Sequence, residues 1–232
     1  MLLNLVLHSK TMSTPERRSV CLQDVVIASW TGRNVAAMES RMVELEELGI
    51  PRPPRVPMLY RVASRRAHTG GVIEVLGERT SGEVEFVLLS LDGRLWVGVG
   101  SDHTDREAET QNAAQSKQVC DKPISMDFWA FEDIEAHWDS LQLRSYIAGP
   151  DAERVLYQQG SVAAMLPPSE LAHLRDSVLK REDSDARLLF CGTLPTIGPI
   201  RHASRFEIEL EDTVLGRSLS HRYDVHVFPA FL

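Results

Sequence analysis

Residues 84–99 carry the strongest local signal for a β-hairpin in the chain. Two segments rich in β-branched and aromatic residues, VEFVLLSL at 84–91 and RLWVGV at 94–99, flank Asp92 and Gly93. An Asp-Gly pair between such segments is typical of a two-residue hairpin turn, because both turn residues must adopt positive φ. The sequence therefore predicts an antiparallel strand pair here.

Strand patterns also dominate the rest of the chain. In residues 204–211, apolar residues alternate with glutamates, which is typical of a strand with one solvated face. Helical spacing of apolar residues occurs at 34–48 and at 169–179. Because the strands are not regularly separated by helices, a doubly wound parallel sheet is disfavoured and we expect an α+β, mainly β fold. Further strands are predicted at 19–30, 72–76, 141–147, 154–159, 187–191 and 220–228.

The charge balance and the cysteines argue against several functions. With 33 acidic against 25 basic residues and a net charge of −8, the chain lacks the basic surface that nucleic-acid binding requires. No apolar stretch reaches the ~18 residues of a membrane span. Cys21, Cys120 and Cys191 lie far apart without a C-x-x-C pair, which indicates free thiols in a reducing compartment. We therefore expect a cytoplasmic protein that binds neither nucleic acid nor membrane.

The chain length suits one domain. A chain of 232 residues can bury its own core without disulfides or a structural metal. Residues 19–232 are predicted to form this single domain. Residues 1–18 are expected to be a loose tail or an edge strand, because the apolar run at 1–7 is too short for a signal sequence and has no basic residue before it.

Three carboxylates are placed to meet at one end of the hairpin. Side chains alternate along a strand, so Glu83 and Glu85 point to the same side, and the hairpin returns the chain so that Asp102 comes close to them. Three converging carboxylates form an all-oxygen site suited to Mg²⁺, Mn²⁺ or Ca²⁺. From the spacing alone, an exposed strand edge with two solvated glutamates is the more common explanation.

The order of motifs around these residues resembles the fumarylacetoacetate hydrolase superfamily. Its E-x-E strand is followed by N-D-x-[ST]-A-R-D, and SDHTDRE at 101–107 stands in that place. Its K-S-x-D segment is similar to Ser116-Lys117-Gln118 with Pro123, and its G-T-P-x-G turn is similar to CGTLP at 191–195 with Gly198. The final G-x-G-x-L-x-N hairpin resembles LGRSL at 215–219. The resemblance covers most of residues 70–228 and implies a mixed β-roll/sandwich with a few peripheral helices.

The resemblance also implies roles for individual residues. Glu83, Glu85 and Asp102 would be ligands of Mg²⁺, or of Mn²⁺ or Ca²⁺. Lys117 would polarise a substrate carbonyl or carboxylate and stabilise developing negative charge. Thr193, with Gly192 in the same turn, would hold the substrate carboxylate. Members of the superfamily are commonly dimers, so the resemblance implies a homodimer.

Two further residues are candidates from their own chemistry. His103 adjoins Asp102 and is a candidate general base, although neighbours on a strand point to opposite sides. Arg61 is a candidate clamp for a substrate carboxylate, and a surface ion pair is its alternative.

One superfamily residue is missing. An early N-Y-x-x-H segment in that superfamily supplies the histidine that activates water, whereas RNVAAME at 33–39 has Met38 at that position. The general base is therefore unassigned, and Glu39 and Glu107 are candidates that solvation of a helix surface explains equally well.

The resemblance implies a divalent-metal-dependent enzyme that acts on a small anionic 2-oxo acid or β-dicarbonyl compound through a metal-bound enolate. Carbon–carbon bond hydrolysis is the expected reaction. Decarboxylation or enol–keto tautomerisation on the same scaffold is the first alternative, because neither requires activated water. A non-catalytic protein that binds metal or ligand is the second.

Overall fold

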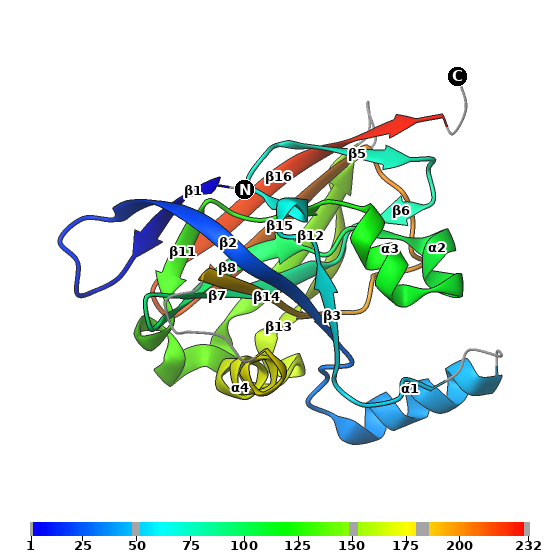
Figure 1. Ribbon diagram of the computed structural model, residues 1–232, viewed down its shortest axis with the longest axis horizontal. Helices are drawn as coiled ribbons and strands as arrows, with labels where there is room; N and C mark the ends of the chain where they lie inside the picture. Colours follow the sequence, from blue (N-terminus) through cyan, green and yellow to red (C-terminus); the bar gives the residue numbers. More distant parts are fainter. Residues whose placement is uncertain (1, 48–51, 149–152, 180–185, 230–232) are drawn as a thin grey trace.

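Two large β-sheets, one of seven strands and one of five, pack against each other in the computed structural model of the protein, which describes residues 2–47, 52–148, 153–179 and 186–229 (Figure 1). The strands are β1 (Leu2–His8), β2 (Glu16–Ser29), β3 (Met58–Val62), β4 (Ala67–His68), β5 (Val72–Leu76), β6 (Thr80–Ser81), β7 (Val84–Leu91), β8 (Arg94–Ser101), β9 (Thr104–Asp105), β10 (Lys122–Pro123), β11 (Asp127–Ala130), β12 (Gln142–Ala148), β13 (Val155–Ser161), β14 (Ala186–Thr193), β15 (Arg205–Asp212) and β16 (Arg217–Phe228). The helices are α1 (Val35–Glu47), α2 (Arg106–Gln111), α3 (Ala113–Val119) and α4 (Pro168–Val178), with short 3-10 helices η1 (Ser64–Arg66), η2 (Phe131–Asp133), η3 (Glu135–Ser140) and η4 (Val162–Ala164).

The hairpin predicted at 84–99 is confirmed as β7 and β8. Leu91 pairs with Arg94, and the two turn residues between them, Asp92 and Gly93, have φ of 50° and 73°. Both values are in the region that a two-residue hairpin turn of this kind requires. The predicted α+β, mainly β fold is also confirmed, because strands make up both main layers and the helices lie around them.

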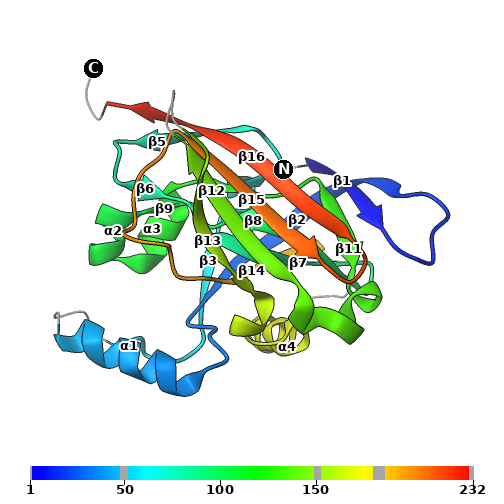
Figure 2. The same ribbon diagram turned by 180° about the vertical axis from the view of Figure 1, so that it is seen from behind.

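The seven-stranded sheet closes on itself. Its order is β1-β11-β8-β7-β14-β2-β3, and an additional pairing between β1 and β2 joins the first strand to the sixth. The segment for which a tail or an edge strand was expected thus contains β1, which pairs in parallel with β11 and antiparallel with β2. The second sheet has the order β13-β12-β15-β16-β5, and Figure 2 shows its strands side by side in front.

The two largest apolar cores follow from this arrangement, and a third, smaller cluster surrounds Tyr157 and Tyr223. One fills the interior of the closed sheet, with side chains such as Leu5, Val87 and Phe190. The other lies between the two sheets, where Phe86 and Val97 of the first sheet meet Ile208 of the second. Alternate residues of β7 enter different cores, as period-two alternation requires.

The helix predicted over 34–48 is α1, and its position is unexpected. Helix α1 projects away from the two sheets in both views (Figures 1 and 2). Of its apolar residues, Met42 is buried, Met38 is half-buried, and Val35 and Val43 are exposed. The predicted end of this helix at Gly49 lies outside the described residues. Among the described residues, no helix has the length and apolar character needed to cross a membrane.

Candidate functional site

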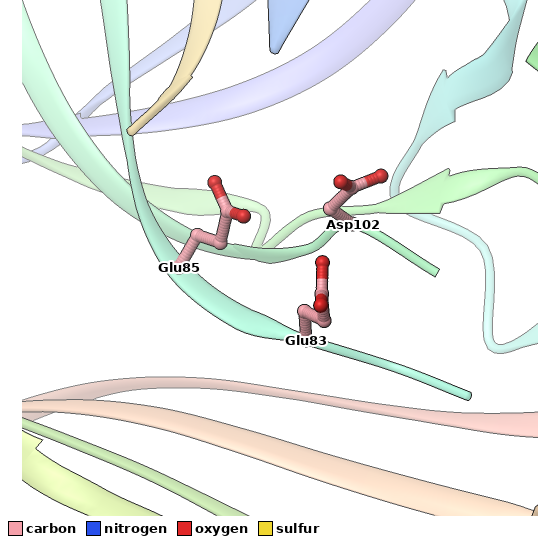
Figure 3. A group of neighbouring side chains, drawn as sticks. All are labelled: Glu83, Glu85 and Asp102. Carbon is pink, nitrogen blue, oxygen red and sulfur yellow. The ribbon is translucent and has the colours of Figure 1, made fainter. Parts of the chain in front are cut away.

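The β7–β8 register brings three carboxylates together. Val84 pairs with Ser101, and one step beyond this pair the Asp102 backbone N–H donates to the Glu83 carbonyl over 3.0 Å. One carboxylate oxygen from each of Glu83, Glu85 and Asp102 lies within 4.8 Å of the other two. Figure 3 shows the three carboxyl groups at the ends of these adjacent strands. The grouping expected from the hairpin and the E-x-E spacing is therefore present.

The cluster lies at the end of the core inside the closed sheet. Glu85 projects from the same face of β7 as Val87 and Leu89, which belong to that core. Glu85 is 2% exposed and Asp102 is fully buried, whereas the Glu83 side chain keeps 17% of its surface exposed. Buried carboxylates need positive partners, and the surrounding residues supply several.

Lys117 of α3 is the central cation of the site. Its Nζ lies 2.5 Å from Asp102 Oδ2, 3.3 Å from Glu83 Oε2 and 3.7 Å from Glu109 Oε1. Burial alone would lower the pKa of Lys117, but the carboxylates of Asp102, Glu83 and Glu109 raise it. The Lys117 side chain is therefore a buried, charged ammonium group.

Two further cations contact the clustered carboxylates. Lys122 Nζ lies 3.2 Å from Asp102 Oδ1, and Arg106 Nη1 lies 3.0 Å from Glu83 Oε1. Burial favours a raised pKa for Asp102, but the ammonium groups of Lys117 and Lys122 outweigh it and lower that pKa. Asp102 is therefore ionised at neutral pH.

Glu85 differs from the other two carboxylates. Its Oε2 accepts a 2.8 Å hydrogen bond from the Gly192 backbone N–H. Burial first, and then the charges of Asp102 and Glu83, hold the pKa of Glu85 well above its usual range. A positive charge close to Glu85 would favour its ionised form. A hard divalent ion supplies such a charge and prefers a cluster of oxygen ligands like this one. The residues of this site therefore fit Mg²⁺, Mn²⁺ or Ca²⁺.

The turn at the end of β14 borders the cluster. Gly192 has φ of 94°, and a side chain there would clash with Thr31, so glycine is required. Thr193 pairs with Glu85 across β7 and β14, and its hydroxyl donates to the Val84 carbonyl over 2.8 Å. The expected substrate-binding pair, Gly192 and Thr193, therefore adjoins the carboxylates.

The side chains of His103 and Arg61 contact residues other than the three carboxylates. His103 is fully buried, with Nδ1 3.1 Å from the Tyr223 hydroxyl and its ring edge-on to Phe206. Burial first, and then the positive charges of Lys122 and Arg106, hold the pKa of His103 well below its usual range. The Arg61 side chain is 55% exposed, and its Nη2 lies 2.5 Å from Asp24 Oδ1. The general-base role of His103 and the clamp role of Arg61 stay predictions.

The sequence alone assigned no role to three charged neighbours of the cluster. Arg106 and Glu109 pair with each other on α2 at 2.9 Å, and Arg106 stands at the arginine position of the second superfamily motif, which was a usable signal. Lys122 gave no signal, because its partners Asp102 and the His103 carbonyl are known only from the fold.

Two surface hollows lie elsewhere on the molecule. One of about 390 Å³ is lined by residues that include Arg33, Trp138 and Ser169, and one of about 620 Å³ by residues that include Tyr146 and His221. None of the three clustered carboxylates lines either hollow.

Comparison with known protein families identifies the family of this chain. Residues 28–223 match the family described as "Protein of unknown function (DUF2848)". The chain belongs to the DUF2848 family. No curated protein matches the DUF2848 chain.

Solved structures similar to the DUF2848 chain share its architecture. One of them, described as "Crystal structures of Cg1458", is 12% identical with a TM-score of 0.59, and the match covers 98% of this chain and 88% of the other. Another, described as "2-keto-3-deoxy-D-arabinonate dehydratase apo form", is 17% identical with a TM-score of 0.61, and the match covers 94% of this chain and 78% of the other. These structures have the fumarylacetoacetate hydrolase superfamily fold, and the DUF2848 chain has the same fold.

Proposed function

We propose that the protein is a divalent-metal-dependent enzyme that acts on a small 2-oxo acid or β-dicarbonyl compound through an enolate. The observation that carries the proposal is the cluster of Glu83, Glu85 and Asp102, in which one oxygen from each carboxylate lies within 4.8 Å of the other two, beside the buried ammonium of Lys117. One of the similar solved structures is of a 2-keto-3-deoxy-D-arabinonate dehydratase, which supports a keto acid as the class of substrate for this fold.

The chain's own residues have separable roles in this proposal. Glu83, Glu85 and Asp102 would hold the metal, which when bound supplies a Lewis acid that polarises a carbonyl oxygen. Lys117 places a second fixed positive charge beside the same carboxylates, where it would stabilise negative charge on the substrate oxygen. Thr193, one strand away from Glu85, is proposed to orient the substrate carboxylate. Arg106 holds Glu83 and Glu109 in place.

Carbon–carbon bond hydrolysis is the first candidate reaction, and it requires a base that activates water. Glu109 supports this candidate because it is a carboxylate 3.7 Å from Lys117 that is not needed as a metal ligand. A lyase reaction, such as decarboxylation or dehydration, is the second candidate. Met38 supports it, since it stands where the superfamily histidine is expected and lies on the projecting helix α1.

The metal site can be tested by calorimetric titration with Mg²⁺ and Mn²⁺, followed by oxalate, which mimics a chelating enolate. We expect Glu85→Gln and Asp102→Asn each to weaken metal binding by more than about tenfold, since each removes a ligand charge. Glu207→Gln is the matched control, because Glu207 lies on the outer face of the five-stranded sheet and pairs with Arg154. Unchanged metal affinity in the first two variants would contradict the ligand assignment.

The reaction class can be tested by incubating the metal-loaded protein with an acylpyruvate, with oxaloacetate and with a 2-keto-3-deoxy sugar acid. Hydrolysis of the carbon–carbon bond gives two fragments, one of which is a new carboxylic acid. Decarboxylation releases CO₂, and dehydration keeps the carbon chain intact. Binding of metal and oxalate without turnover of any of these compounds would favour a non-catalytic binding protein.

A further inference from the structure

A buried tyrosine of the five-stranded sheet contacts both neighbours of Asp102. The Tyr223 hydroxyl on β16 lies 2.8 Å from Ser101 Oγ and 3.1 Å from His103 Nδ1. Tyr223 is fully buried, and its ring stacks on Phe206 with centroids 5.5 Å apart. One hydroxyl group therefore spans the residues immediately before and after a proposed metal ligand.

The same contacts extend to a second proposed ligand. The Glu83 backbone N–H donates to Ser101 Oγ over 3.2 Å, and the Asp102 backbone N–H donates to the Glu83 carbonyl over 3.0 Å. Tyr223 is thus connected through Ser101 to the backbone of Glu83. Space is also restricted, because a side chain at Gly82 would clash with Tyr223 and Ser101.

We propose that Tyr223 is a positioning residue that fixes Asp102 and Glu83 in the geometry needed for divalent-metal binding. This inference rests on the proposed function, since it concerns the same metal site. Groups that hydrogen-bond to the residues around a metal site orient the ligands, and their removal typically weakens metal affinity by about 10–100-fold. Tyr223 acts across the interface between the two sheets, so the second sheet contributes to the site without supplying a ligand.

The chain offers a matched control in Tyr157. Both tyrosines are fully buried and belong to the same apolar cluster, and Phe206 contacts both rings. The Tyr157 hydroxyl, however, contacts Ser81 Oγ at 2.9 Å and accepts from the Arg201 backbone N–H at 3.2 Å. A tyrosine-to-phenylalanine change at either position removes one buried hydroxyl, but only the change at Tyr223 removes a contact to the neighbours of Asp102.

The test measures Mn²⁺ dissociation constants of the wild type, Tyr223→Phe and Tyr157→Phe by electron paramagnetic resonance, after thermal unfolding has shown that each variant is folded. We expect Tyr223→Phe to bind Mn²⁺ about tenfold more weakly, and Tyr157→Phe to remain within about twofold of the wild type. Should Tyr223→Phe not fold, Ser101→Ala replaces it, because it breaks the link between Tyr223 and Glu83 while keeping the aromatic ring.

The outcomes separate the inference from the proposed function. Wild-type affinity in Tyr223→Phe, or in Ser101→Ala where that variant is used, overturns the inference alone. An equal loss in Tyr157→Phe also overturns it, because the effect would then be general to buried hydroxyls of this cluster. Absence of Mn²⁺ binding by the wild type overturns the proposed function and the inference together.

Discussion

At the residue scale, Lys117 compensates the negative charge of the site before any metal binds. Its ammonium group lies within 3.3 Å of Glu83 and Asp102, and both Lys117 and Asp102 are almost completely buried. Removing one partner of such a pair leaves an uncompensated charge in the interior, which typically costs about 3–5 kcal/mol. The charge that stabilises the folded chain is therefore the same charge that the proposed chemistry uses.

We expect Lys117→Met to lower the free energy of unfolding of the metal-free protein by about 3 kcal/mol or more. Added Mg²⁺ should restore part of this loss, because an ion that binds only the folded state stabilises it. Chemical denaturation with and without Mg²⁺ measures both effects. Arg205→Met is the control, since Arg205 forms an exposed pair with Asp224, and exposed pairs contribute little to stability. A loss no larger than the control's would show that Lys117 does not carry this role.

Residue-scale prediction from the sequence succeeded where the partners are local. Glu83, Glu85 and Asp102 are joined by a hairpin whose turn is readable from Asp92-Gly93, so period-two alternation allowed their grouping to be proposed. The spacing alone favoured an exposed strand edge, and the family resemblance was needed to prefer a shared site. The environment of His103 was not predictable in this way. It is created by Phe206 and Tyr223, which lie about a hundred residues later in the chain and reach His103 only through packing of the two sheets.

At the element scale, the turn between β15 and β16 depends on one buried carboxylate. Asp212 Oδ1 accepts from the backbone N–H groups of Val214 and Leu215, and its two oxygens also lie within 3.2 Å of His137 and Arg217. Burial favours a raised pKa for Asp212, but the Leu215 N–H, His137 and Arg217 outweigh it and lower that pKa. The ionised form is therefore preferred in the folded state.

A folded-state pKa below the unfolded value gives stability that is present above the unfolded pKa and is lost as pH falls through the folded pKa. We expect Asp212→Asn to be less stable than the wild type by about 1–3 kcal/mol at pH 7. This difference should shrink as pH falls below the ordinary aspartate pKa of about 3.9. Urea unfolding between pH 7 and pH 3 tests this expectation, with Glu74→Gln at an exposed position of strand β5 as control. A difference that is independent of pH would contradict the ionic role.

Elements with a clear periodic pattern were predicted well, and elements without one were not. The strand predicted at 72–76 coincides with β5, and the helix predicted at 169–179 is α4 within one residue at each end. Helices α2 and α3 carry no apolar stripe. They begin instead at side-chain caps, where Asp105 accepts from Glu107 and Ala108 and where Asn112 accepts from Gln115. Because these short helices bear Arg106, Glu109 and Lys117, much of the site depends on elements with a weak sequence signal.

At the scale of the whole molecule, closure of the seven-stranded sheet is what the sequence could not reveal. β1 pairs with β11, more than a hundred residues away, and β14 inserts between β7 and β2. The sequence pattern predicts strands but not which strands become neighbours. Closure nevertheless decides where the site lies, since Glu85 projects from the face of β7 that the closed sheet encloses. The family resemblance implied a mixed β-roll/sandwich without the order of its strands, and the similar solved structures share the fold.

The cysteines report on the packing of two different apolar clusters. Cys191 lies in the core between the two sheets and Cys120 in the cluster around Tyr223, whereas Cys21 is exposed. Burial raises the pKa of Cys120 to about 11 and holds that of Cys191 well above the ordinary thiol value. Because only the thiolate reacts readily, both buried thiols are protected by their low ionisation as well as by their burial.

We therefore expect one thiol per chain to react quickly with a disulfide reagent in the native protein at pH 8, and three to react in denaturant. The two slow thiols should react at least about a hundredfold more slowly than Cys21, since burial and a raised pKa act together. Cys21→Ser is the control, and it should abolish the fast phase without changing the slow one. Fast reaction of Cys191 in the folded protein would mean that the two sheets separate readily, which is incompatible with the role proposed for Tyr223 on the second sheet.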